Sequence, residues 1–284
     1  MSININTNLA SLRGQRFLNI TSDRLSSTYS RLSSGKRINT ASDDAAGLAI
    51  ADALKTNQRV ASVAVRNAQD GISTVSIADG ALDQVSGFLQ RLAELAQQAA
   101  SGSYTSDQRQ AMQGEFTALG SEIERIATTT VFNGVVLLSG GNQIILQVGF
   151  DAKSTSQLVI NQPTATLQGL GLSSGSFLSY SLTGTTVEEG QSSARNAING
   201  VNGALLSMNN LRGNLGSAES RLLSAISNLQ VARENLTAAE SRIRDVDVAL
   251  EAAELTRLNI LQQTGAAVLA QANQQPQLAL TLLR

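Results

Sequence analysis

Residues 194–253 read ARNAINGVNGALLSMNNLRGNLGSAESRLLSAISNLQVARENLTAAESRIRDVDVALEAA. Apolar or small side chains recur through this stretch at alternating intervals of three and four residues. The seam consists of Ala194, Ala197, Val201, Ala204, Met208, Leu211, Leu215, Ala218, Leu222, Ala225, Leu229, Ala232, Leu236, Ala239, Ile243, Val246, Leu250 and Ala253. Such a stripe lies on one face of a helix and is stable only when other helices bury it along its whole length. The pattern therefore predicts a long helix in a helical bundle.

Two more seams share this period. The second consists of Val75, Ala78, Leu82, Val85, Leu89, Leu92, Ala96 and Ala99, and the third of Met112, Phe116, Leu119, Ile123 and Ile126. Aromatic residues make up only 3% of the chain, and Trp is absent. Cores filled by Leu, Ile, Val and Ala suit narrow helix–helix seams. We expect a mainly α fold, a long antiparallel, coiled-coil-like helical rod.

Helix-terminating and capping residues indicate where the helices end. A stripe of Leu18, Leu25, Tyr29 and Leu32 should stop near Gly35. Residues 38–44 are expected to form an irregular connector, in which Ser42, Asp43 and Asp44 offer caps for the next helix. That helix should break at residues 101–103, and Asp107 or Ser106 should cap the shorter helix that follows.

One region, about residues 131–191, is predicted to contain a small β-hairpin at one end of the rod. Asn133-Gly134 is a turn signal, and residues 144–148 are expected to pair with residues 158–160. Residues 162–191 are rich in Gly, Ser and Thr and are expected to form a loop. A phosphate-binding loop is the alternative for residues 169–175, but the strand-turn-helix context and the lysine are missing.

The two ends of the chain carry stripes too narrow to be buried alone. We expect residues 1–44 and 245–284 to form paired terminal helices with their connectors, and residues 45–244 to form the rod. The terminal helices should need each other and further copies of the chain, so that their order comes from assembly. The first segment is basic and the last begins with acidic residues, which indicates either contact between the ends or independently solvated charges.

Composition excludes several classes of function. The chain has no His and no Cys, so it cannot build a Ser-His-Asp site, a Cys-His site, a common zinc site or a disulfide. The neighbouring acids Asp43-Asp44, Glu188-Glu189 and Asp245/Asp247 are interpreted as caps or solvated groups rather than catalytic pairs. A net charge of −1 lacks the excess of basic residues that is typical of nucleic-acid-binding proteins. We expect no enzyme activity, cofactor, metal or membrane insertion, and the opening residues 2–8 lack the apolar stretch of a cleavable secretory signal.

Several motifs in order resemble bacterial flagellin over nearly the whole chain. They are the opening Ser2–Asn8, the stretch RLSSGKRINTASDDAAG at residues 31–47, the Phe132-Asn133-Gly134 turn, SRIRDVD at residues 241–247, and the ending VLAQANQQP at residues 268–276 followed by Leu282-Leu283-Arg284. The resemblance implies a filament subunit whose terminal helices form an inner tube inside an outer tube of longer helices. It also implies export in an unfolded state through the flagellar type III apparatus, an export chaperone, a filament cap, and an extracellular location in the flagellum. The short middle region implies almost no outer decoration.

The resemblance also implies roles for particular residues. It assigns the polymerisation core to Leu18, Leu25, Leu32, Leu258, Leu261 and Val268. Residues 89–96 resemble the segment that Toll-like receptor 5 recognises on monomeric flagellin, with Arg91, Leu95 and Glu115 at matching positions. The alternative is that this surface serves filament packing.

Three other functions are alternatives. A hook–filament junction protein would share the terminal helices but should not match flagellin at both residues 241–247 and the C-terminus. A soluble coiled-coil adaptor would not need its ends to oligomerise. An enzymatic flagellin would need a metal-binding insert that this chain cannot build. The sequence favours the filament subunit.

Overall fold

The computed structural model describes residues 7–282, and the side chains as far as Gln274. The first five residues of the opening motif, Ser2–Asn6, and the last two of the ending, Leu283-Arg284, lie outside the described residues. The chain divides into two compact units. We call residues 1–58 with 234–284 the terminal unit, and residues 59–233 the central unit.

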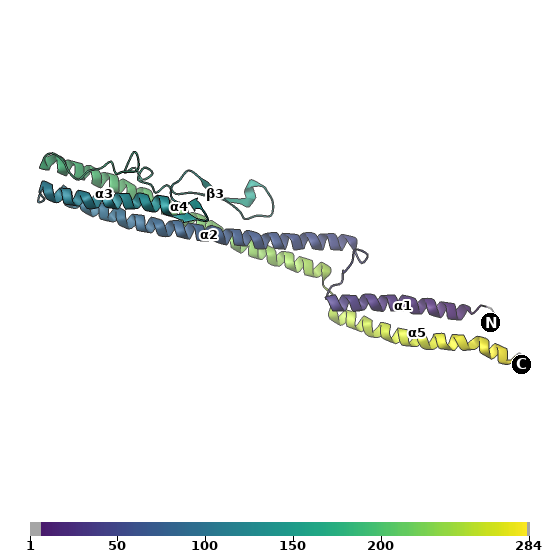
Figure 1. Ribbon diagram of the computed structural model, residues 1–284. Coiled ribbons are helices and arrows are strands. Elements are labelled where there is room, and N and C mark those ends of the chain that lie inside the picture. Colours follow the sequence, from purple (N-terminus) through teal and green to yellow (C-terminus); the bar gives the residue numbers. More distant parts are fainter. Residues whose placement is uncertain (1–6, 283–284) are drawn as a thin grey trace. The chain divides into compact units, whose positions relative to one another are not determined.

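Two helices dominate the terminal unit, α1 (Leu9–Ser34) and α5 (Val248–Leu282). They lie side by side and antiparallel (Figure 1), since Gly14 faces Leu269 and Leu18 faces Gly265. Asn8 ties their outer ends together. Its Nδ2 donates to the Ala272 carbonyl at 2.8 Å, and its Oδ1 caps α1 by accepting from the Ser11 N–H at 3.0 Å. We call these two helices the α1–α5 pair.

The connector after α1 begins and ends at the residues that the sequence predicts. Gly35 ends α1 in the left-handed region at φ 67°, which glycine adopts without strain. Helix α2 (Ala45–Ala100) begins behind Asp44, whose Oδ1 accepts from the Gly47 N–H at 2.9 Å. Asp43 orders the connector itself, because its Oδ2 accepts from the N–H groups of Asn39 at 3.1 Å and Thr40 at 2.9 Å. Both predictions, the stop and the cap, are confirmed.

The long seam is interrupted where α4 (Val187–Arg244) ends. Residues 245–247 leave the helix, and α5 starts in a new register at Val248. The Val246 N–H instead donates to the Gly35 carbonyl at 3.1 Å. Leu250 is 67% exposed and Ala253 is also exposed within one chain. Beyond Val246, other helices of the same chain therefore do not bury the seam, because the helix is interrupted at residues 245–247.

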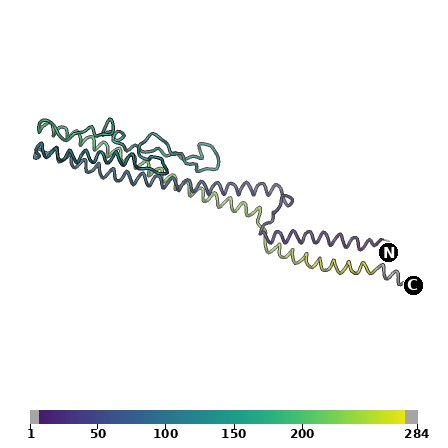
Figure 2. Tube along the Cα trace, in the orientation of Figure 1, coloured from purple at the N-terminus to yellow at the C-terminus, as the bar shows by residue number. Residues whose placement is uncertain are grey.

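The central unit packs α2, α3 (Ser106–Thr129) and α4 side by side (Figures 1 and 2). Helices α2 and α4 run antiparallel, since Arg212 bonds to Asp79 and Asp83 at 2.9 Å while Leu229 packs with Ala64 and Val65. The second seam is buried throughout, and Phe116 and Ile123 of the third seam are fully buried. No helix within the described part of the chain is long and apolar enough to cross a membrane.

The turn between α2 and α3 differs from expectation in its cap. Helix α2 ends at Ala100, as predicted, but Thr105 caps α3 instead of Asp107 or Ser106. Its extended backbone lets its hydroxyl accept from the Gln108 N–H, while Gln108 Oε1 accepts from the Thr105 N–H at 2.9 Å. This reciprocal capping box satisfies two helix-end donors, which a cap at Asp107 would leave open.

Two antiparallel strand pairs follow α3. Strands β1 (Val131–Phe132) and β2 (Val135–Val136) flank the predicted turn, where Asn133 and Gly134 have φ of 49° and 79°. Strands β3 (Gln143–Gln147) and β4 (Gln157–Asn161) pair with Ile145 opposite Val159. A short 3-10 turn, Ser154–Ser156, precedes β4. The predicted pairing of residues 144–148 with 158–160 is confirmed.

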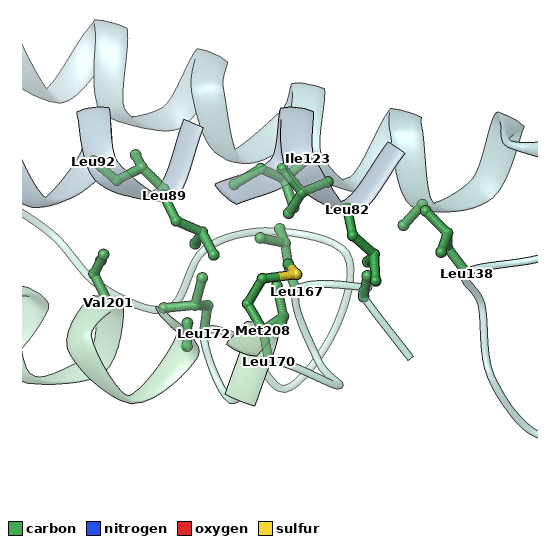
Figure 3. Packing of buried hydrophobic residues seen from close by; sticks show 14 of the residues in the cluster. Leu82, Leu89, Leu92, Ile123, Leu138, Leu167, Leu170, Leu172, Val201 and Met208 are labelled. Atoms are coloured by element: carbon green, nitrogen blue, oxygen red, sulfur yellow. The ribbon is translucent and has the colours of Figure 1, made fainter. Parts of the chain in front are cut away.

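The loop after β4 forms part of the core. Leu167, Leu170 and Leu172 reach between Met208 of α4 and the seam residues of α2 and α3 (Figure 3). Leu167 is fully buried, and its N–H donates to Glu124 Oε2 of α3 at 2.8 Å. The Gly- and Ser-rich composition predicted only a loop. Its few leucines have no regular period, so their burial depends on tertiary packing that the pattern does not carry.

Candidate assembly and receptor-binding surfaces

The α1–α5 pair carries all six residues predicted for the polymerisation core. Leu258 is buried at 2% exposure between the two helices. Four others are half-buried: Leu18, Leu25, Leu32 and Leu261. Val268 is 61% exposed and points away from the partner helix of its own chain. The pair thus buries one stripe internally and leaves further apolar surface open.

Exposed apolar side chains lie along both helices of the pair. On α1 they are Leu9, Leu12, Phe17, Ile20 and Tyr29, and on α5 they are Val248, Leu250, Ile260 and Val268. Each of these residues has 44–67% of its surface exposed to solvent. Apolar residues lie on all sides of α5. This distribution is typical of a helix buried on all sides, whereas a surface helix keeps one polar face. Exposed apolar side chains in this number make the two helices a candidate interaction site.

Arg91 and Glu115 meet on the surface of the central unit. Arg91 Nε donates to Glu115 Oε1 across from α2 to α3 at 2.8 Å, and its Nη1 donates to Glu94 Oε2 at 2.9 Å. The hydrogen bond with Glu115, followed by that with Glu94, raises the pKa of Arg91. The arginine and Glu115 remain nearly half exposed. Two carboxylates therefore fix the guanidinium plane at this surface, and the sequence pattern alone does not identify Glu94 as the third member.

Leu95 does not share this surface. It is 1% exposed and belongs to the hydrophobic core of the central unit. Helix α2 is covered on two sides, by α3 and by α4, so the buried stripe is wider than the three-and-four seam and includes Leu95 next to Ala96. The structure thus brings Arg91 and Glu115 together on the surface and places Leu95 in the core.

The charged groups do not form a metal site. Within residues 7–282, no group of three or more His, Cys, Asp or Glu side chains is placed to hold a metal ion. Arg212 and its two aspartates join α4 to α2, whereas the pairs Arg125–Glu122 and Arg257–Glu254 each lie within one helix.

Comparison with known proteins gives matches over nearly the full length. The bacterial flagellin N-terminal helical region matches residues 5–143, and the bacterial flagellin C-terminal helical region matches residues 198–283. Flagellin of Halalkalibacterium halodurans is 42% identical over 281 residues, covering 99% of both chains. Flagellin of Bacillus subtilis is 39% identical over 305 residues, again covering 99% of each.

Two further matches carry related names. The flagellar filament 30.7 kDa core protein of Treponema maltophilum is 36% identical over 288 residues, which covers 98% of this chain and 99% of that protein. Among solved structures, Bacillus cereus flagellin aligns with a TM-score of 0.48 at 25% identity, over 58% of this chain and 88% of that one.

Proposed function

We propose that the α1–α5 pair forms the inter-subunit core of a helical homopolymer. The chain belongs to the bacterial flagellin family and is a structural subunit of the flagellar filament, not an enzyme. The observation that carries this proposal is the exposed apolar surface along both helices. In this arrangement residues 1–44 and 245–284 form the inner part of the filament and residues 45–244 the outer part.

Burial in a polymer accounts for this apolar surface energetically. Full burial of a large apolar side chain stabilises by about 1.5–3 kcal/mol, and these side chains are already about half buried. Completing their burial contributes roughly 1 kcal/mol each, before the entropy cost of association is subtracted. The sum over both helices is large enough to hold a subunit in a polymer.

Seeded polymerisation of truncated chains tests the proposal. Removal of residues 1–34 or of residues 255–284 should leave the helices of the central unit folded and abolish elongation from filament seeds, because either cut deletes half of the α1–α5 pair. Circular dichroism checks the folding. Long filaments from a truncated chain would contradict the proposal, whereas an intact chain that only coats seed ends would favour the hook–filament junction protein.

The same apolar faces need cover before assembly. We assign that role to a flagellar export chaperone, followed by passage of the unfolded chain through the flagellar type III apparatus and assembly beneath the filament cap, outside the cell. Unfolded passage is compatible with a chain that has no Cys and hence no disulfides. The test is secretion by a bacterium lacking its own flagellin, with and without a working export apparatus. Equal amounts of protein in both media would contradict this route.

The surface around Arg91 is the proposed contact for Toll-like receptor 5. Support comes from the fixed guanidinium of Arg91, which presents directed donors next to Glu115. Arg91→Ala and Glu115→Ala should each reduce the potency of the free chain on receptor-reporter cells roughly tenfold, the effect of losing about 1.4 kcal/mol. Arg125→Ala is the matched control, since Arg125 is an exposed α3 arginine paired with Glu122. Equal potency for all variants would remove the assignment, and a polymerisation defect alone would favour a packing role.

A further inference from the structure

A groove of about 600 Å³ opens between α1 and α5 in the terminal unit. The side chains that matter for the argument are Arg24, Arg31, Leu250, Glu251, Glu254 and Arg257. The groove combines charged groups with the exposed Leu250, and it lies entirely within the α1–α5 pair.

Glu251 is the anomaly in this groove. It is 6% exposed, yet its side chain makes no hydrogen bond or ion pair with any described residue, and its Oε1 is fully buried. An ionised carboxylate removed from water is costly unless a cation or donors compensate it. Buried polar groups in folded proteins almost always have a partner. Glu251 therefore points to a missing partner at the groove.

No arginine of the same groove forms a hydrogen bond or ion pair with Glu251. Arg257 bonds to Glu254 at 2.7 Å. Arg31 lies 3.8 Å from Asp43, and its own Nε is buried without a partner in the described chain. Arg24 is exposed to solvent. The groove thus contains a buried acceptor and a buried donor that the single chain leaves unmatched.

Two unpaired arginines of α1 lie too far from Glu251 within one chain. Arg13 and Arg16 of α1 are exposed and pair with no described residue. They flank Gly14, which faces Leu269 of α5. At 1.5 Å per residue, Leu269 lies about five helical turns, or about 27 Å, from Glu251 along α5. A cation from this part of α1 can reach Glu251 only from another molecule.

We propose that the groove is a docking site for α1 of a second copy of this chain, and that Arg13 or Arg16 of that copy pairs with Glu251. The inference rests on the proposed polymerisation and assigns it one charged contact. Charge complementarity supports it, as does the apolar flank on both sides: Phe17 follows Arg16 at 49% exposure, and Leu250 precedes Glu251 at 67%. Apolar contacts around an ion pair exclude water, which strengthens the pair.

The test compares elongation with the stability of the free chain. Glu251→Gln removes the charge and keeps the shape, and Glu188→Gln, at an exposed site in the first turn of α4, is the matched control. We expect Glu251→Gln to raise the critical concentration for seeded elongation roughly tenfold or more while leaving the melting temperature and helical content of the free chain unchanged or higher. A structural role within the chain would instead lower the melting temperature.

Charge reversal identifies the partner. Glu251→Arg and the double variant Arg13→Glu/Arg16→Glu should each block elongation, and the triple variant that combines them should return the critical concentration to near that of the unaltered chain. Normal elongation of Glu251→Gln, or a triple variant no better than its parents, would overturn the proposal and leave the filament assignment intact. Failure of the unaltered chain itself to elongate would overturn both.

Discussion

Leu229 tests the register of the long seam in α4. It is 5% exposed and packs with Ala64 and Val65 of α2 and with Ile226. Leu229→Asp forfeits about 2 kcal/mol of apolar burial and forces a carboxylate among apolar side chains of the helix interface. The combined cost is on the order of 4 kcal/mol. For a unit of this size, about 2–4 °C is lost per kcal/mol, so the melting temperature should fall by roughly 8–16 °C.

A matched control lies two residues further along the same helix. Val231 is 59% exposed, so Val231→Asp should change the free energy of unfolding by less than about 0.5 kcal/mol. The assay is thermal unfolding of the free chain followed by far-UV circular dichroism. Equal melts for the two variants, or a larger loss for Val231→Asp, would refute the register of the seam.

Three further variants probe local features. A Cβ at Gly71 would lie 2.2 Å from Leu146 Cδ1, so Gly71→Ala should destabilise the free chain by about 1–2 kcal/mol in thermal melts. Gly80 has open space around it, so Gly80→Ala should stabilise the chain by about 0.5–1 kcal/mol. A change in stability of the same sign for both variants would contradict the α2–β3 contact. Arg109 is 1% exposed and donates through Nε to the Ala99 carbonyl in the last turn of α2 and through Nη2 to the Ser101 carbonyl just beyond it. Arg109→Lys should therefore cost about 2–3 kcal/mol in chemical denaturation, and a negligible change would show that the two guanidinium bonds are dispensable. Backbone hydrogen bonds from Thr40 and Asn39 lower the pKa of Asp43. Asp43 therefore stabilises the connector above its unfolded pKa of about 3.9, and this stabilisation is lost as the pH falls through the lower folded pKa. Hydrogen exchange at the Thr40 and Asn39 amides should show this loss, and Asp43→Asn should abolish the pH dependence.

Local chemistry made much of the fold predictable. Gly35 is the left-handed residue that ends α1, and Asp44 caps α2, because each acts on neighbours within four residues. The Asn133-Gly134 turn was equally readable, since positive φ at both positions favours these residue types. The three seams gave the buried faces of α2, α3 and α4, since their period is a property of the sequence alone.

Tertiary context decided what the sequence could not show. Arg109 lies in a polar segment, which predicts a surface residue. It is nevertheless buried, because its guanidinium donates hydrogen bonds to backbone carbonyls at the end of α2. The buried leucines of the loop after β4 have no period, and Leu95 joins the core only because two helices cover α2. The break at residues 245–247 leaves the three-and-four pattern intact while the backbone departs from helix.

The candidate surfaces were predictable to different degrees. The stripes at the two ends indicated helices that need further partners, and the exposure of Val268 and Leu250 in a single chain agrees with that interpretation. The buried, unpaired Glu251 had no signal in the sequence, because only the packed pair of helices reveals which carboxylate lacks a cation.

The central claim is that the α1–α5 pair is exposed in the free chain and buried in the filament. The chain has no Cys, so a single cysteine at Leu250 or at Val268 reports on its own site without background. The measurement is the rate of maleimide labelling of Leu250→Cys and Val268→Cys in free chains and in assembled filaments. Labelling should be roughly tenfold slower in the filament at both positions, because burial removes the thiol from solvent. Equal rates in the two states would contradict it.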